Sequence, residues 1–67
     1  MKWFEIKRLD WIFEMLQIYG FINREHLVRK FGISVPQASH DLNKYIKLHP
    51  DTVIYDKTLK RYERKSK

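Results

Sequence analysis

The segment from Asn23 to Tyr62 reads NREHLVRKFGISVPQASHDLNKYIKLHPDTVIYDKTLKRY, and it decides the fold of this 67-residue chain. Its first part has the pattern of two short helices separated by a tight turn, and its last part has the pattern of a β-hairpin rich in lysine and arginine. That order of elements is typical of a winged helix-turn-helix. We therefore predict a mainly α-helical fold of three helices plus a small β-hairpin, the wing.

Capping residues predict where the two helices of this segment begin and end. Asn23 is a favourable N-cap, so the second helix is expected to start with the next residue and to end at Gly32, which allows a left-handed backbone. Ser34 is expected to open the third helix in a capping box completed by Gln37, and Pro50 is expected to end it. The inward positions of these helices are then Leu27, Val28, Phe31, Ala38, Leu42, Tyr45, Ile46 and His49.

A longer helix is predicted ahead of this segment, from Trp3 to Tyr19, with Gly20 as the left-handed residue that stops it. Its apolar residues form two stripes. The stripe expected to face the core contains Ile6, Leu9, Phe13 and Leu16, and the stripe nearly opposite contains Phe4, Trp11, Met15 and Ile18. Because a surface helix needs only one apolar face, we expect the second stripe to be covered, either by a second copy of the chain across a two-fold axis or by the wing and tail.

The wing is expected to follow the third helix directly. Two strands, Thr52–Tyr55 and Leu59–Glu63, flank a turn at Asp56–Thr58. Phe21-Ile22 forms a very short extended piece between the first two helices. Residues 64–67 are predicted to form a frayed basic tail.

Composition and charge narrow the class of partner. Residues 1–67 suffice for a single small domain, and the absence of cysteine excludes disulfides and thiolate metal sites. The net charge is +6, and the stretch from Lys57 to the end carries six basic residues against one acid. Such asymmetry favours a polyanion, either nucleic acid or an anionic membrane surface. No stretch is apolar enough for a transmembrane helix, so we expect a cytoplasmic protein associated with the prokaryotic nucleoid and not with a membrane.

The outward face of the third helix carries polar residues suited to reading DNA. Gln37, Ser39 and His40 lie near its start, where a recognition helix touches bases, and glutamine pairs well with adenine. The residues expected at the DNA backbone are Arg24, Asn43, Lys44, Lys47, Lys57, Thr58 and Lys60. Two simpler explanations stay open: an ordinary solvated helix face, and wing lysines that only prevent aggregation between sheet edges. Asp41 interrupts the positive surface and is expected to pair with a cation that the sequence does not identify.

Nothing in the sequence predicts catalysis. His26, His40 and His49 lie on different helical turns, at spacings that fit no metal-binding motif. Ser34 and Ser39 have no base with an orienting group in a matching pattern, and there is no glycine-rich phosphate loop. We therefore expect no enzyme activity, no metal site, no cofactor and no small-molecule ligand.

Several short motifs resemble a known family. They are Phe21-Ile22-Asn23-Arg24, the run FGISVPQAS that starts at Phe31, Asp41-Leu42, Tyr55-Asp56-Lys57 and Lys60-Arg61-Tyr62. Together they resemble the N-terminal winged-helix domain of WYL-type transcriptional regulators, in particular the repressors of bacterial phage-defence operons such as BREX and CBASS. The run from Ser34 to Leu42 is also loosely similar to DeoR-type repressors. The likeness covers nearly the whole chain.

The resemblance implies a repressor that binds palindromic DNA as a dimer. The positions it carries over are Val35, Gln37, Ser39 and His40 for base contacts, and Lys57 and Lys60 for the wing. Those relatives continue into a WYL domain and a C-terminal dimerisation domain, which this sequence does not contain. We therefore expect a short stand-alone regulator, without WYL-based ligand sensing, that forms a homodimer through the first helix at Phe4, Trp11, Met15 and Ile18. Two alternatives share the fold: an architectural, excisionase-type protein that bends DNA, and a module that binds another protein.

Overall fold

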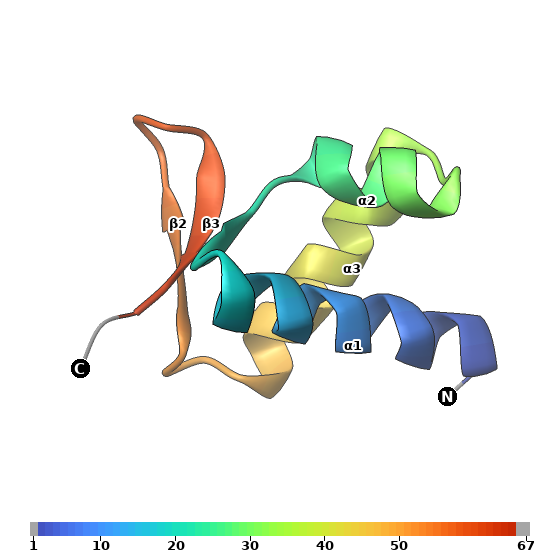
Figure 1. The fold of residues 1–67 in the computed structure, drawn as a ribbon, viewed down its shortest axis with the longest axis horizontal. Helices are drawn as coiled ribbons and strands as arrows, with labels where there is room; N and C mark the ends of the chain where they lie inside the picture. The colour runs from blue at the N-terminus through green and yellow to red at the C-terminus, as the bar shows by residue number, and fades with distance from the viewer. Residues whose placement is uncertain (1, 66–67) are drawn as a thin grey trace.

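Three helices and a three-stranded antiparallel sheet make up the fold (Figure 1). The structure, a computed structural model, describes residues 2–65. In chain order the elements are α1 (Trp3–Ile18), β1 (Phe21–Ile22), α2 (Arg24–Phe31), α3 (Val35–Leu48), β2 (Val53–Asp56) and β3 (Arg61–Arg64). This architecture confirms the predicted winged helix-turn-helix, with β2 and β3 as the wing.

The ends of α1 and α2 follow from local sequence, as predicted. Gly20 and Gly32 have φ angles of 81° and 65°, which residues with a side chain adopt only with strain. Asn23 caps α2, because its Oδ1 accepts a hydrogen bond from the backbone N–H of His26 at 3.1 Å. The Nδ1 atom of His26 accepts one from the backbone N–H of Asn23 at 3.3 Å in return, so the first turn of α2 is closed from both sides.

Both ends of α3 differ in part from the prediction. The Ser34 hydroxyl accepts a hydrogen bond from the backbone N–H of Gln37 at 3.2 Å, which confirms the N-cap. The Gln37 side chain contacts Asp41 instead of turning back to Ser34, so only one half of the predicted capping box forms. At the other end His49 is exposed and not in the core, and its ring lies 4.6 Å from that of Tyr45.

The core lies where α1, α2, α3 and the sheet meet, and its buried side chains are Leu9, Ile12, Leu16, Ile22, Leu27, Ala38, Leu42, Tyr45 and Val53. The inward face of α1 differs from the predicted one. Ile12 is buried, whereas Ile6 and Phe13 are 41% and 51% exposed. Helical spacing places Leu9, Ile12 and Leu16 on one face of α1, so the burial of these three turns Ile6 and Phe13 to one flank of the helix.

The second apolar stripe of α1 is divided between the core and the surface. Trp11 and Met15 are half-buried and pack against the core, and the Trp11 ring meets the Phe31 ring edge-on at 5.6 Å. Phe4 and Ile18 are 70% and 69% exposed. The fold itself therefore covers half of the stripe that was expected to form a dimer interface.

The wing differs from the prediction in three ways: its first strand is shifted by one residue, its second strand is one residue shorter, and its turn is longer. The strand order is β1-β3-β2, and β1 pairs with β3 through Ile22 and Tyr62, so the short extended piece becomes a third strand. The turn occupies residues 57–60, because Asp56 Oδ1 accepts hydrogen bonds from the backbone N–H groups of Thr58 and Leu59 at 2.8 and 3.0 Å. Lys60 then has a φ of 55°, which delays the second strand by two residues from its predicted start.

The predicted frayed tail is wrong for its first two residues. Arg64 belongs to β3, and its backbone N–H donates to the carbonyl of Gly20 at 2.9 Å. The backbone N–H of Lys65 donates to the carbonyl of Thr52 at the same distance. These bonds fasten the base of the wing to both neighbouring segments, while the rest of the predicted tail, 66–67, lies outside the described residues.

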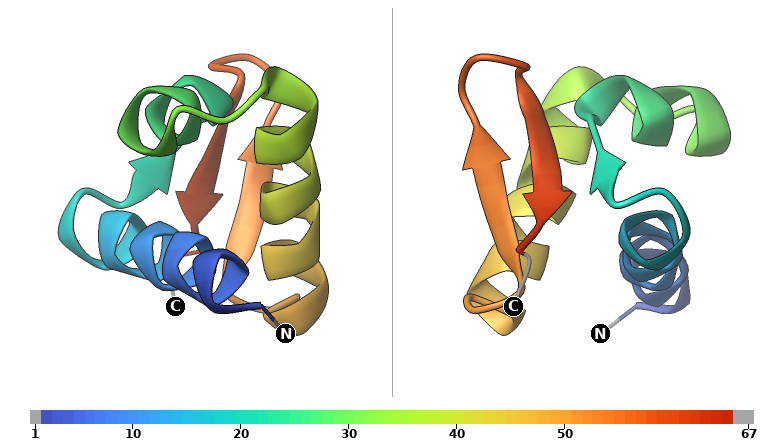
Figure 2. Two further views of the ribbon diagram at one scale, coloured as in Figure 1. Left: turned by 90° about the vertical axis from the view of Figure 1, so that its right-hand side faces the viewer. Right: turned by 60° about the vertical axis from the view of Figure 1, so that its left-hand side comes forward.

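The tip of the wing and the first turn of α3 both lie at the upper end of the molecule in Figures 1 and 2, but Figure 1 shows them well apart, on opposite sides of that end. Both views in Figure 2 show α3 running away from that end, with α1 crossing in front of the sheet or beside it. Only a partner that extends across the molecule can therefore contact both the start of α3 and the turn of the wing.

Candidate nucleic-acid interface

One side of α3 is free of the core and faces outward. Pro36, His40, Asn43 and Lys47 recur at helical spacing and are all exposed, and we call them the outer stripe. The opposite side carries the buried residues of α3, so the helix stands against the core with the outer stripe turned away from it. Histidine and asparagine can donate to and accept from base edges, and lysine binds phosphate. The major groove admits an α-helix, and the outer stripe has the chemistry to contact base edges and phosphates there.

His40 and Lys47 lie on the outer stripe, where the sequence predicted outward side chains. Asn43 was assigned to the DNA backbone, but it lies between these two residues along the centre of the stripe. Val35 is 48% exposed in the first turn of α3, beside the stripe. Its methyl groups can contact the methyl group of thymine.

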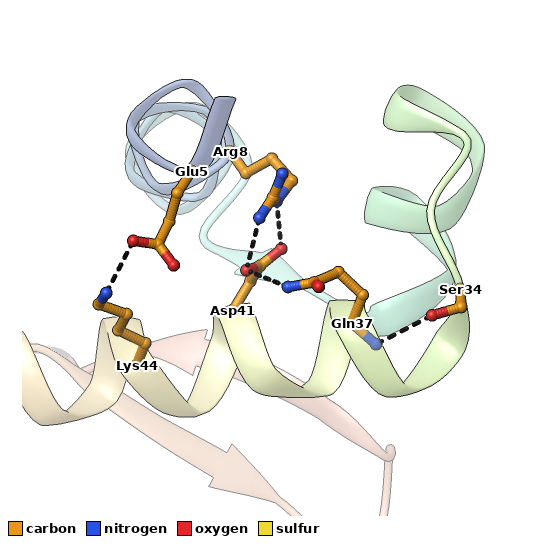
Figure 3. Close-up of polar contacts among 6 residues, drawn as sticks. All are labelled: Glu5, Arg8, Ser34, Gln37, Asp41 and Lys44. Atoms are coloured by element: carbon orange, nitrogen blue, oxygen red, sulfur yellow. Dashed lines mark hydrogen bonds and ion pairs between the residues drawn. The ribbon is translucent and has the colours of Figure 1, made fainter. Parts of the chain in front are cut away.

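Asp41 has two partners that its sequence position did not reveal. Its carboxylate is fully buried, and Arg8 of α1 binds it with Nε 2.6 Å from Oδ2 and Nη2 3.3 Å from Oδ1. Gln37 donates from Nε2 to Oδ1 at 3.0 Å (Figure 3). A carboxylate that interrupts the apolar side of a helix signals such a network, because buried charges are paired in folded proteins.

Lys44 was predicted to lie free on the DNA-facing side of α3. It instead forms an ion pair that joins α3 to α1. Its Nζ is 2.7 Å from Oε1 of Glu5, and both side chains are partly buried. The hydrogen bond from Lys44 holds the pKa of Glu5 below its usual value, and the charges of Lys44, His40 and Arg8 act in the same direction. In this arrangement Lys44 neutralises a carboxylate, which weakens the case for a phosphate contact.

Ser39 and Arg24 lie together at the junction of α2 and α3. Arg24 donates from Nη1 to the Ser39 hydroxyl at 3.4 Å, a long bond at an exposed site. Burial raises the pKa of Tyr62 on β3, the neighbouring Tyr55 raises it further, and the positive charge of Arg24 opposes both. Arg24, at the start of α2, is thus close to Ser39 of α3, and Ser39 sits to one side of the outer stripe.

The wing presents its cations at the turn. Lys57, Thr58 and Lys60 are all exposed, and the hydrogen bonds that Asp56 accepts from the backbone of the turn shape the segment that carries them. Arg61, in contrast, is bound to Glu63 with Nε 2.7 Å from Oε2, and its guanidinium lies 4.3 Å from the ring of Phe21. The turn is thus the part of the wing that can reach a second phosphate strand or a minor groove.

A groove between α1 and the start of α3 adjoins the outer stripe. Its lining consists of Lys2, Phe4, Glu5, Arg8, Gln37 and His40. Lys2 is exposed at this groove and adds a cation near His40 that the sequence patterns did not single out, because nothing local distinguishes it from other surface lysines.

Within residues 2–65, no group of three or more histidine, cysteine or acidic side chains is arranged to hold a metal ion. The helices of the same part of the chain are too short or too polar to span a membrane. What the described geometry does offer is one polar helix face flanked by exposed cations.

Comparisons with known proteins point the same way. Residues 5–67 match the family described as the BrxR transcriptional regulator winged helix-turn-helix domain. The chain is 48% identical over 61 residues to the DNA-binding transcriptional repressor CapW of Escherichia coli (strain KTE188), an alignment that covers 91% of this chain and 20% of that protein. It is 45% identical over 56 residues to CapW of Stenotrophomonas maltophilia, covering 84% and 19% of the two chains. It is 43% identical over 61 residues to CapW of Pseudomonas aeruginosa, an alignment that covers 91% of this chain and 20% of that protein. The chain thus spans about a fifth of the length of these relatives.

Proposed function

This chain belongs to the family of BrxR transcriptional regulator winged helix-turn-helix domains, and on that premise we propose that it binds double-stranded DNA by sequence and represses transcription by occluding a promoter. The observation that supports this most is the outer stripe of α3, which lies exposed along the whole helix, and the exposed cations of the wing turn add to it. The role is one of binding and not of catalysis. Because its target is the chromosome, we place the protein in the cytoplasm, at the nucleoid.

In this proposal α3 enters the major groove. His40 and Asn43 reach base edges from the middle of the outer stripe, and Val35 and Gln37 do so from its first turn. Lys47 binds a phosphate at the far end of the helix. Ser39 acts mainly through Arg24, whose guanidinium donates to its hydroxyl.

The electrostatic part of binding comes from cations around this helix. Lys57 and Lys60 in the wing turn, with the Thr58 hydroxyl, contact the backbone or an adjacent minor groove, and Arg24 contacts the backbone from the start of α2. The net charge of +6 attracts any duplex, so this component is independent of sequence and sensitive to salt. Base contacts from α3 then discriminate among sites.

The test is a selection from a random-sequence duplex library at moderate salt, followed by sequencing of the retained DNA. We expect an enriched motif that the double variant His40→Ala/Asn43→Ala no longer enriches. The matched control is Gln17→Ala, which removes an exposed polar side chain of α1 away from the outer stripe and should enrich the wild-type motif. Retention of no DNA, or a motif unaffected by the double variant, contradicts the proposal.

Two other outcomes would favour the alternative functions. Binding without any enriched motif, together with strong bending of DNA, would indicate an architectural protein of the excisionase type. Weak association that is the same for every duplex and insensitive to salt would indicate a module that binds another protein, because phosphate contacts make DNA binding salt-dependent.

We further propose that the protein binds an inverted repeat as a homodimer that pairs through α1. The support is the exposure of Phe4 and Ile18, which share one side of the helix and are 70% and 69% exposed. Trp11 and Met15 lie on the same side but pack against the core, so they contribute at most their outer edges. Large exposed apolar side chains on one side of a helix are typical of an interface.

Ile18→Glu tests this arrangement better than a change at Trp11, which would also remove core packing. We expect a folded monomer by sedimentation that binds the selected DNA more weakly. Phe13→Glu is the matched control, because Phe13 is equally apolar but lies on the other flank of α1. A wild-type monomer, or dissociation by Phe13→Glu and not by Ile18→Glu, would contradict an interface at Phe4 and Ile18.

A further inference from the structure

The hydrogen bond between Gln37 and Asp41 fixes which end of the glutamine amide faces away from the helix. A carboxylate accepts hydrogen bonds and cannot donate them, so only the NH2 end of the Gln37 amide can face it. Nε2 lies 3.0 Å from Oδ1 of Asp41, and Figure 3 shows the amide nitrogen turned toward it. Turning the amide over would bring two oxygen acceptors together, which is unfavourable.

Asp41 cannot move aside to permit that rotation. Its side chain is fully buried, and the guanidinium of Arg8 binds both carboxylate oxygens, at 2.6 and 3.3 Å. Arg8 is itself largely buried, with 14% of its side chain exposed, and comes from α1. The orientation of Gln37 is therefore held by a contact between two helices and not only by its own rotamer.

The amide oxygen of Gln37 remains available. Among residues 2–65 it has no hydrogen-bond donor, and none of the fully buried side-chain oxygen or nitrogen atoms in that range lacks a partner. The oxygen therefore reaches solvent, at a groove that His40 of the outer stripe also lines. A glutamine held in this way presents an acceptor to whatever approaches the start of α3.

We propose that Asp41 is a specificity-determining positioning residue, which holds Gln37 so that its oxygen accepts a hydrogen bond from the exocyclic amine of a base in the major groove. This inference rests on the proposed DNA binding. Adenine and cytosine offer such an amine, whereas guanine and thymine present oxygen acceptors at the corresponding place. An unrestrained glutamine could turn over and donate to those oxygens, so the restraint from Asp41 narrows the choice of base.

Three variants, each tested in the library selection, separate the base contact made by Gln37 from the restraint that Asp41 places on it. Gln37→Ala should lose the preference for adenine or cytosine at one position of each half-site. Asp41→Asn keeps the shape of the side chain but can donate as well as accept, so Gln37 can turn over and guanine or thymine should be admitted at that position. We expect the wild-type discrimination there, roughly tenfold, to fall to about twofold, with other positions unchanged.

Glu5→Gln is the matched control, because among residues 2–65 the Glu5–Lys44 ion pair is a second polar link between α1 and α3 in which Gln37 takes no part. It should loosen the same pair of helices and leave the base preference unchanged. A loss of preference in Glu5→Gln equal to that in Asp41→Asn would overturn the restraint, since general loosening would then explain the effect. Unchanged discrimination in a folded Asp41→Asn protein would also overturn it.

A measurement on the wild-type protein keeps the inference testable if Asp41→Asn does not fold. The wild-type protein should bind a duplex in which the contacted base lacks its exocyclic amine roughly tenfold more weakly than the parent duplex. The Gln37→Ala variant should bind the two duplexes equally well. Equal binding of both duplexes by the wild type would overturn the acceptor role of Gln37. A wild-type protein that enriches no motif would instead overturn the proposed function, and this inference with it.

Discussion

Arg8 of α1 and Asp41 of α3 form an ion pair in which the carboxylate is fully buried and its Oδ2 lies 2.6 Å from the Arg8 Nε. The two residues are 33 positions apart in the chain, so the pair joins the first helix to the candidate recognition helix. The stability of such a pair depends strongly on the cation, because its removal leaves a buried carboxylate without a compensating charge. The pair therefore links stability to the placement of α3.

Arg8→Met should destabilise the protein by roughly 3–5 kcal/mol, because it strands the buried carboxylate of Asp41. The double variant Arg8→Met/Asp41→Leu should recover much of that loss, since no charge is then left in the interior. Denaturation by urea measures both. A loss below about 1 kcal/mol for the single variant would show that Asp41 is compensated by other groups.

Acid should remove the contribution of the Glu5–Lys44 pair. The pKa of Glu5 is lowered in the folded protein from its usual value of 4.5, so the pair stabilises the fold fully above that value. The stabilisation is lost as the pH falls through the lowered pKa. Glu5→Gln should thus be less stable than wild type at about pH 7, and the difference should shrink as the pH falls below the usual pKa of Glu5. A difference that persists unchanged in acid would argue against the ion pair.

Gly32→Ala should cost about 1 kcal/mol through the backbone alone. Gly32 has a φ of 65°, and an added Cβ would meet no atom within 4 Å, so no clash contributes. Gly32→Asn is the natural comparison, because asparagine tolerates the left-handed conformation better than alanine. Thermal denaturation should rank the three proteins as glycine, asparagine, alanine. Alanine as stable as glycine would mean that the turn before α3 relaxes to another conformation.

Two lysines of α3 should differ in their effect on the salt dependence of DNA binding. Lys47 lies on the outer stripe, so Lys47→Ala should reduce the slope of log affinity against log salt by about 0.9, the value of one phosphate contact. Lys44 is bound to Glu5, so Lys44→Ala should leave the slope nearly unchanged. Lys57→Ala in the wing turn should behave like Lys47→Ala. Equal slopes for both α3 variants would show that the ion pair of Lys44 opens on DNA.

Features that depend on neighbouring residues could be predicted from the sequence. Asn23 and Ser34 cap their helices, and Gly20 and Gly32 end theirs, because each effect operates within one turn. The outward position of His40 follows from the same helical period. These local signals were enough for the order of elements and for one face of α3.

Contacts between distant segments could not be predicted in this way. Helical spacing gives the angle between two side chains but not how the helix is rotated against its neighbours, which is why Phe13 was expected in the core and Ile12 was not. The partner of Lys44 lies 39 residues away, and a lysine on a positive surface gives no sign of it. The longer turn of the wing depends on the Asp56 side chain, which accepts hydrogen bonds from the backbone two and three residues later. The composition of this segment fits a tighter turn equally well, so the sequence did not distinguish the two.

Methylation interference on the selected DNA site tests most directly whether α3 reads the major groove. Dimethyl sulfate methylates guanine N7 in the major groove and adenine N3 in the minor groove. We predict that N7 methylation within each half-site prevents binding, that Asn43→Ala or His40→Ala weakens this interference at individual bases, and that N3 methylation interferes only beside the half-site, where the wing lies. Interference confined to adenine N3, or absent at every guanine, would contradict the central claim that α3 enters the major groove.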